Sequence, residues 1–256
     1  MKRLVPSLFT LCSCLIFVLT FIPASTAAAI VQAPRIRAKD GTSTNWSGYA
    51  VETSLTSPQS GAVSDVKGTW TVPSVTCGST ATYSSFWVGI DGYSSNSVEQ
   101  TGTDSDCSGG SGVYYAWYEM YPKASQVISG LAVHPGNVIS AEVRFNGSGS
   151  FTLILDNTST GGHFSINLSS RKAARSSAEW IAEAPSSGGV LPLANFGTVN
   201  FSNASATLKG VSGSISSSAW QNDAITMVNS SGAVKAAVSG LGSGGSSFGV
   251  SWKSSN

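Results

Sequence analysis

The sequence predicts an all-β protein, and three observations support this fold class. From Asn45 onward, short apolar or alternating runs are separated by Gly, Ser, Asn and Asp residues. Turn dipeptides such as Asn146-Gly147 and Ser231-Gly232 lie in these breaks. No stretch sustains an apolar stripe with helical spacing over several turns. Many short, evenly spaced strands are typical of a β-sandwich or barrel, and no repeat of about 20–50 residues indicates a propeller or solenoid.

Each predicted strand is rich in Val, Ile, Thr or aromatic residues, or alternates apolar with polar positions, and is bounded by turn residues. In chain order, the predicted strands are residues 46–53, 63–72, 83–90, 113–121, 138–145, 150–156, 163–168, 178–182, 195–201, 204–208, 224–228 and 246–252.

The N-terminal residues predict export. Residues 1–28 combine the charged start Lys2-Arg3 with a long apolar run and small residues before a cleavage site, which is typical of a secretory signal peptide. An uncleaved anchor fits the small residues less well, and nothing later is apolar for long enough to span a bilayer. Residues 29–44 form a short leader, either a pro-segment or a loose terminus. Residues 45–256 suffice for one domain with a hydrophobic core, which we expect outside the cell.

The charge balance gives no basic face for nucleic acid. The chain has 14 basic and 13 acidic residues, and loss of Lys2 and Arg3 with the signal leaves 12 against 13. Charged residues make up only 11% of the chain, while aromatic residues are plentiful, so the chain is not of the disordered class. Low charge with many Ser and Thr residues suits an exported β-protein, and hints at an acidic environment.

Two cysteines remain once the signal is removed. An even pair in an exported chain, here Cys77 and Cys107, indicates one disulfide, and we expect both residues in loops. A metal site is not expected from two cysteines and the separated His134 and His163, both of which lie beside turn residues.

Two carboxylates lie close together in residues 177–185, in a chain that is otherwise poor in charge. In a strand, a period of two places Glu179, Ile181 and Glu183 on one face. In a helix the two carboxylates would be a mildly destabilising like-charge pair. Carboxylates on a semi-apolar strand point to catalysis, whereas a solvated edge strand is the plainer interpretation, which this run alone favours.

A second run, residues 113–122, alternates in the same way. It places Tyr115, Trp117, Glu119 and Tyr121 on one face. An aromatic face with one carboxylate suits a cleft for an extended chain or a sugar, and an aromatic ladder between strands is an equal alternative.

Residues 85–92 likewise give Trp87, Gly89 and Asp91 one face that ends in a turn. Two standard hydrolase classes are unsupported. No Asp-Thr-Gly or Asp-Ser-Gly motif indicates an aspartic protease, and the Gly-x-Ser-x-Gly match at 245–249 is followed by neither Asp nor His.

Taken together, these runs resemble the glutamic peptidases, the eqolisin family. The matching pieces occur in the family's order and cover nearly all of residues 45 to about 208. They are NWSG at 45–48, TWTVP at 69–73, WVGIDG at 87–92, QTG at 100–102, AWYE at 116–119, AEWIAE at 178–183 and NFGTV at 195–199.

This resemblance implies a β-sandwich of two antiparallel sheets, a concanavalin-like jelly roll, with a substrate cleft on one face. It implies a monomeric endopeptidase that acts on protein or peptide substrates at acidic pH, needs no cofactor and resists pepstatin. The implied catalytic residues are Gln100 and Glu183, the second Glu of its motif. The implied substrate-binding residues are Trp46, Trp87, Asp91, Trp117, Glu119 and Tyr121.

Three features depart from the family's pattern. Ala184 follows Glu183 where fungal members have Asp, Met120 stands where an aromatic residue is common, and the leader is much shorter than the fungal propeptide. The short leader leaves zymogen control open.

The implied chemistry is physically reasonable. An ionised Glu183, with an ordinary pKa near ~4, would act as general base on a water in acid, where a His could not. The Gln100 amide would donate to the oxyanion of the tetrahedral intermediate. Two alternatives stay open: a non-catalytic β-sandwich that binds carbohydrate or peptide, and a glycosidase whose carboxylate pair is Glu119 and Glu183.

Overall fold

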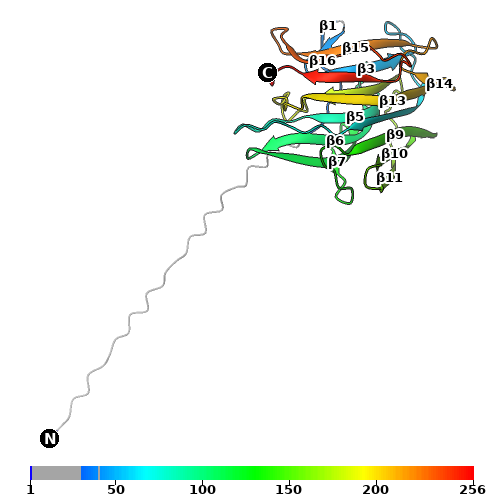
Figure 1. The fold of residues 1–256 in the computed structure, drawn as a ribbon. Helices are drawn as coiled ribbons and strands as arrows, with labels where there is room; N and C mark the ends of the chain where they lie inside the picture. The colour runs from blue at the N-terminus through cyan, green and yellow to red at the C-terminus, as the bar shows by residue number, and fades with distance from the viewer. Residues whose placement is uncertain (2–29, 40) are drawn as a thin grey trace.

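The computed structural model describes residues 1, 30–39 and 41–256, so the predicted signal peptide, apart from Met1, lies outside the described residues. All regular structure in the described part is β-strand (Figure 1). No helix that could cross a membrane occurs there. The strands form two layers, which are linked by one strand that belongs to both, so the all-β prediction is confirmed.

The first layer, here called the site sheet, is antiparallel throughout. Its strands in spatial order are β15 (Gln221–Val228), β3 (Trp46–Glu52), β12 (Ser177–Glu183), β5 (Ser85–Ile90), β6 (Val98–Ser108), β7 (Ser111–Tyr121) and β8 (Gln126–Val127).

The second layer, the opposite sheet, is also mainly antiparallel. Its strands in spatial order are β11 (Gly162–Ser169), β10 (Ser150–Asn157), β9 (Val138–Gly147), β4 (Val63–Thr71), β13 (Thr198–Leu208), β17 (Phe248–Trp252) and β16 (Val234–Val238). β14 (Val211–Ser214) pairs with the end of β13.

β15 joins the two layers. Its first half pairs with β3 in the site sheet, and its last residues pair with β16 in the opposite sheet. The same end pairs in parallel with β2 (Thr42–Ser43), which pairs with β1 (Arg37–Lys39). The leader is therefore part of the folded domain.

Two apolar clusters follow from the alternation along the strands. The larger cluster fills the space between the sheets and includes Trp70, Phe86 and Trp180. The smaller cluster lies on the outer face of the site sheet. It consists of Trp46, Ala50, Trp87, Val98, Trp117, Ile181 and Ile225. Because successive residues of a strand point to opposite faces, β3, β12, β5 and β7 each contribute to both clusters, whereas β6 contributes Val98 to the smaller one alone.

Each predicted strand corresponds to an observed one, but β14 and β16, like the short β1, β2 and β8, were not predicted, and three further points differ. Residues 195–201 and 204–208 belong to one strand, β13. β12 pairs on both sides, with β3 and β5, so the interpretation of residues 177–185 as a solvated edge strand is wrong. β6 was not predicted, because its Thr, Ser, Asp and Gly residues resemble a loop, yet all but its last residue are buried.

The predicted disulfide is confirmed, since Cys77 and Cys107 are bonded with their Cα atoms 5.4 Å apart. The expectation that both lie in loops is wrong for Cys107. That residue is on β6, and its backbone exchanges hydrogen bonds with Thr82. The bridge therefore ties the loop before β5 to the distal end of β6.

Candidate active site

Glu183 ends the central strand β12, opposite Trp46 on β3 and Ser85 on β5. As predicted, Glu179, Ile181 and Glu183 share the outer face of the site sheet: Ile181 packs in the outer apolar cluster, whereas Trp180 packs between the sheets. Glu183 is fully buried. Strand alternation thus places this carboxyl group on the outer face without a solvent contact of its own.

Gln100 lies on β6, in register with Gly89 of β5 and Glu119 of β7. Its amide Nε2 donates to Glu119 Oε2 at 3.2 Å. Its Oε1 is buried and has no protein hydrogen-bond partner among the described residues. Two positions along β6, a Cβ on Gly102 would lie 2.3 Å from the Phe86 carbonyl oxygen, so the close approach of β5 and β6 requires glycine.

Part of the leader lies across these two side chains. We call residues 30–36 the leader segment. The backbone carbonyl oxygen of Gln32 accepts from Gln100 Nε2 at 2.8 Å. The next backbone N–H, that of Ala33, donates to Glu183 Oε1 at 2.9 Å. The peptide bond between Gln32 and Ala33 therefore lies between the two predicted catalytic residues, and the interpretation of this leader as a loose terminus is wrong.

Side chains also hold the other polar groups of this stretch. The Gln32 N–H donates to Glu119 Oε2 at 3.0 Å, and the Ala33 carbonyl oxygen accepts from Trp46 Nε1 at 2.9 Å. The Asn45 amide donates to the carbonyl oxygens of Ala33 at 3.3 Å and Pro34 at 3.1 Å. A backbone pair between Val31 and Ser186 fixes the segment at one end.

Glu183 is surrounded by donors and by one competing acid. Burial, followed by the charge of Glu119, raises its pKa well above the ordinary value. Hydrogen bonds from Trp87 Nε1 at 2.9 Å, from the Ala33 N–H and from the Asn45 amide oppose this rise in pKa. The expected pKa near ~4 therefore does not describe Glu183 in the covered site, because the carboxyl group is fully buried there.

Glu119 is a second buried acid at the site. Burial raises its pKa to about 8, and hydrogen bonds from the Gln32 N–H and the Gln100 amide lower it only in part. In acid Glu119 is therefore neutral, and its charge no longer opposes the ionisation of Glu183.

The structure brings most of the predicted site residues together. Trp46 and Trp87 pack edge to face with ring centroids 5.0 Å apart, and both contact the leader segment or Glu183. Trp117 and Tyr121 belong to, or border, the same outer cluster. The alternation predicted for β7 is confirmed.

Asp91 lies elsewhere. Its carboxylate accepts from the backbone N–H groups of Arg175 at 2.7 Å and Ser176 at 2.9 Å, and no recorded hydrogen bond of this side chain goes to the leader segment. It anchors the loop that precedes β12, so its role in substrate binding remains a prediction.

Sequence reasoning missed two contacts of the site. Asn45 touches both Glu183 and the leader segment, and Ser85 accepts from Gln32 Nε2 at 3.1 Å. Asn45 is the first residue of the NWSG piece at 45–48, and that position beside Trp46 was the one sign in the sequence that it could belong to the site. Ser85 begins β5 in register with Glu183, so the strand pairing could have indicated it.

Further buried acids lie on the same sheet. Burial raises the pKa of Glu52 to about 7 and of Glu99 to about 8, and it raises that of Glu179 well above its ordinary value. At the other end of β6, burial raises the pKa of Asp104 to about 6 and of Asp106 to about 8. In the folded protein these acids therefore keep their protons well above pH 4, where ordinary carboxyl groups ionise, and most of them up to about neutral pH. In the described ranges, no three His, Cys, Asp or Glu side chains are arranged to hold a metal ion.

Comparison with known proteins places this geometry in a family. A profile described as the peptidase A4 family matches residues 44–250. Aspergillopepsin-2 of Aspergillus niger is 32% identical over 169 residues, which is 57% of this chain and 60% of that protein. Scytalidopepsin B of Scytalidium lignicola is 36% identical over 162 residues, 59% of this chain and 61% of that protein. The match thus spans about three fifths of each relative's length.

Solved structures show the same fold. Scytalido-glutamic peptidase with a transition state analog inhibitor superposes with a TM-score of 0.68 at 29% identity, over 82% of this chain and 98% of that one. Aspergilloglutamic peptidase from Aspergillus niger gives a TM-score of 0.60 at 29% identity, over 67% of this chain and 99% of that one. The predicted two-sheet sandwich is therefore confirmed.

Proposed function

Because this chain belongs to the peptidase A4 family, the glutamic peptidases, we propose that it is a secreted, monomeric acid endopeptidase whose catalytic residues are Gln100 and Glu183. One observation carries the proposal. A peptide bond lies between the two side chains. Its carbonyl oxygen accepts a hydrogen bond from Gln100 Nε2 at 2.8 Å, and its N–H donates to Glu183 Oε1 at 2.9 Å. The predicted signal peptide supports secretion.

Hydrolysis begins with addition of water to the carbonyl carbon. Glu183 in its ionised form takes a proton from the water, and the oxygen of that water bonds to the carbon. The carbonyl oxygen becomes an oxyanion, to which the Gln100 amide already donates, so this donor needs no reorganisation as charge develops. Gln100 Oε1, a buried acceptor without a protein partner in the described chain, suits the remaining proton of the water.

Collapse of the intermediate needs an acid at the nitrogen. Glu183 lies within hydrogen-bond distance of the peptide nitrogen, whose N–H donates to its Oε1. Once protonated in the first step, it gives its proton to the leaving amine as the C–N bond breaks. A carboxyl group with a raised pKa suits this second step, because it holds the proton until the amine departs.

Glu119 completes the arrangement. Its Oε2 accepts from both the Gln100 amide and a backbone N–H of the bound segment, and so fixes the amide with its donor toward the carbonyl. We assign it a positioning role. Trp46 and Asn45 hold the next carbonyl groups, and the substrates are extended segments of proteins or peptides.

The test is hydrolysis of denatured casein by the secreted protein between pH 2 and 7, with and without pepstatin. Pepstatin-resistant acid proteolysis is expected. Gln100→Ala should lower kcat by about 10²–10³-fold, since it removes the oxyanion donor, and Glu183→Gln by more, since it removes the base and the acid.

Glu179→Gln is the matched control. It changes a buried Glu of the same strand face whose contacts lie away from the leader segment, so activity should persist. Equal activity of Glu183→Gln and wild type would contradict the assignment. Peptide binding without turnover at any pH would instead show a non-catalytic binding protein.

A further inference from the structure

The leader segment is bound in the manner required of a substrate. All four backbone polar groups of Gln32 and Ala33 are hydrogen-bonded to side chains of the site sheet or to Asn45, which precedes β3. Gln32 as a whole is 1% exposed, and its side-chain amide donates to Ser85 Oγ. A terminus resting on the surface would not bury these groups. The segment occupies the place where an external peptide would have to bind.

Resting on the proposed function, we propose that the Gln32–Ala33 peptide bond is a self-processing site, cleaved by Gln100 and Glu183 of the same chain. Water adds to the Gln32 carbonyl carbon, its first proton passes to Glu183 and then to the Ala33 nitrogen, and the C–N bond breaks. The products are a carboxyl group on Gln32 and an amino group on Ala33. Water is the only co-reactant.

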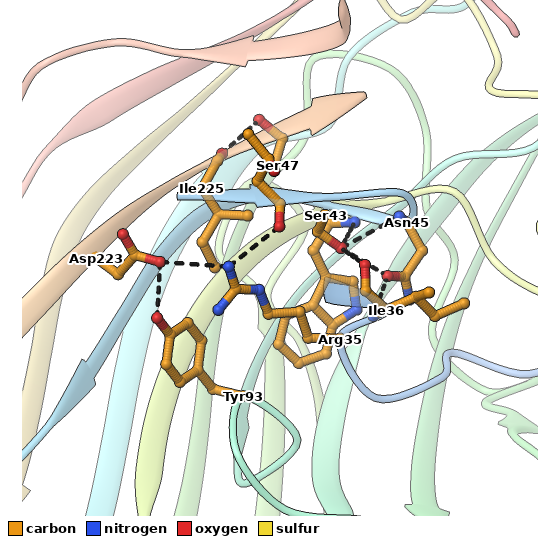
Figure 2. A network of polar contacts seen from close by, with 10 residues as sticks. Arg35, Ile36, Ser43, Asn45, Ser47, Tyr93, Asp223 and Ile225 are labelled. Atoms are coloured by element: carbon orange, nitrogen blue, oxygen red, sulfur yellow. Dashed lines mark hydrogen bonds and ion pairs between the residues drawn. The ribbon is translucent and has the colours of Figure 1, made fainter. Parts of the chain in front are cut away.

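A buried ion pair sets the register of the segment. The Arg35 side chain is 2% exposed, and its guanidinium lies 3.6 Å from Asp223 Oδ2. The same guanidinium donates to the Thr42 carbonyl oxygen and lies over the Tyr93 ring, 4.4 Å from its centroid. Figure 2 shows Asp223 bridging Arg35 and the Tyr93 hydroxyl. Because Arg35 is held two residues after Ala33, only one peptide bond reaches both catalytic side chains.

The connection between the segment and the domain makes the reaction intramolecular. After Arg35, the Ile36 N–H donates to Asn45 Oδ1 at 2.7 Å, and the Thr44 N–H donates to the Ile36 carbonyl oxygen at 2.9 Å. Figure 2 shows Ile36, Ser43 and Asn45 joined by polar contacts, among them those of the Ser43 hydroxyl with the Ile36 carbonyl oxygen and with Asn45 Oδ1. The chain thus runs through β1 and β2 to β3 of the same molecule, so the Gln32–Ala33 bond and both catalytic side chains belong to one chain.

Until it is cleaved, the segment excludes other substrates. It takes the Gln100 amide donor, the Glu183 acceptor and the Trp46 donor at once. Hydrolysis of casein should therefore begin with a lag, and the lag should end as the Gln32–Ala33 bond is cut.

The experiment follows the N-terminus of the full secreted chain by mass spectrometry after a shift from neutral pH to pH 3–4. A new N-terminus at Ala33 is expected, with a rate constant that is unchanged over a roughly 100-fold range of protein concentration, as for any intramolecular reaction. Glu183→Gln should keep the bond intact, and wild-type enzyme added in equal amount should not cut that variant's leader at the intramolecular rate.

Two pairs of variants test the site. Ala33→Pro removes the N–H bonded to Glu183 and should block cleavage, whereas Ala38→Pro makes the same change in β1, away from Gln100 and Glu183, and should not. Asp223→Ala should slow processing roughly 10-fold or more, because it leaves the Arg35 charge buried without its partner. Asp156→Ala, which removes an exposed pair with His163 on the opposite sheet, should leave the rate unchanged.

The outcomes separate this proposal from the proposed function. Casein hydrolysis with the leader intact, or with a cut at another bond, overturns the self-processing site and leaves the peptidase assignment standing. A concentration-dependent rate overturns the intramolecular step. Absence of both casein hydrolysis and processing overturns both proposals.

Discussion

The indole Nε1 of Trp87 donates to Glu183 Oε2 at 2.9 Å, and both side chains are completely buried. A hydrogen bond to a carboxylate favours the ionised form, so this indole opposes the rise in pKa that burial causes. A catalytic base that must work in acid depends on such a donor.

Trp87→Phe should therefore raise the pKa of Glu183 further. The acid limb of the kcat/KM profile is expected to move upward by roughly one pH unit, the order expected from one hydrogen bond to a charged group. Trp117→Phe is the control, because that indole donates to Asp104 instead. An equal shift in both variants would show that the effect comes from lost packing.

Stability should be greatest in acid. The buried acids Glu52, Glu99, Asp106 and Glu119 have pKa values raised to between about 7 and about 8, so the folded state keeps their protons while the unfolded chain loses them above about pH 4.5. The free energy of unfolding should then fall as pH rises from 4.5 to 8, by up to about 1.4 kcal/mol per pH unit for each group. Urea unfolding of the strongly impaired Gln100→Ala variant at several pH values measures this with little self-digestion.

Glu179→Gln in that background isolates one group. Glu179 is fully buried, and burial raises its pKa, so a neutral isostere should flatten the fall in unfolding free energy above pH 4.5. Glu142→Gln, at a partly buried position on β9 where the side chain is 17% exposed and paired with Lys67 and Arg144, serves for comparison. A fall as steep as in the parent would mean that Glu179 titrates normally.

Gly102→Ala should destabilise the protein and lower its activity together. The added Cβ would lie 2.3 Å from the Phe86 carbonyl oxygen and 2.6 Å from Trp87 Cβ, so β5 and β6 must separate near Gln100. A loss of about 1–3 kcal/mol in urea unfolding is expected from overpacking. Gly130→Ala adds the same methyl group where nothing lies within 4 Å, and should cost far less.

Reduction of the Cys77–Cys107 disulfide should lower stability by about 3–4 kcal/mol on the chain-entropy account, given the separation of 30 residues. The measurement compares urea midpoints with and without dithiothreitol. The double variant Cys77→Ser and Cys107→Ser should have the same urea midpoint with and without dithiothreitol. A shift in that variant would mean that the reductant acts elsewhere.

Strand periodicity predicted the part of the site that lies on apolar strands. Alternation alone placed Glu183 with Ile181, and Trp117 with Glu119 and Tyr121, on faces that the structure confirms. β6 was not predicted, because Thr101, Gly102, Thr103 and Asp104 show no apolar pattern. These residues form a strand because they pair with the neighbouring strands β5 and β7. The role assigned to Gln100 came from family resemblance and not from its surroundings.

The leader segment could not be predicted, for a different reason. Its contacts join residues far apart in sequence, as in the bond from the Gln32 N–H to Glu119, 87 positions away. No local pattern in residues 29–44 encodes such a contact, since the segment has neither alternation nor a cap of its own. Its conformation follows from donors and acceptors that the domain supplies.

The central position of β12 limits how a peptide can be recognised. Both edges of this strand are already paired, so its backbone offers no free N–H or C=O to which a substrate could add as a further strand. At Gln32 and Ala33 the bound chain is instead held mainly by side chains that contact its backbone groups, which are common to every residue, while the Gln32 amide also donates to Ser85 Oγ. A cleft built in this way accepts many sequences at the scissile bond. Selectivity is then decided farther along, where a side chain such as Arg35 finds a charged partner.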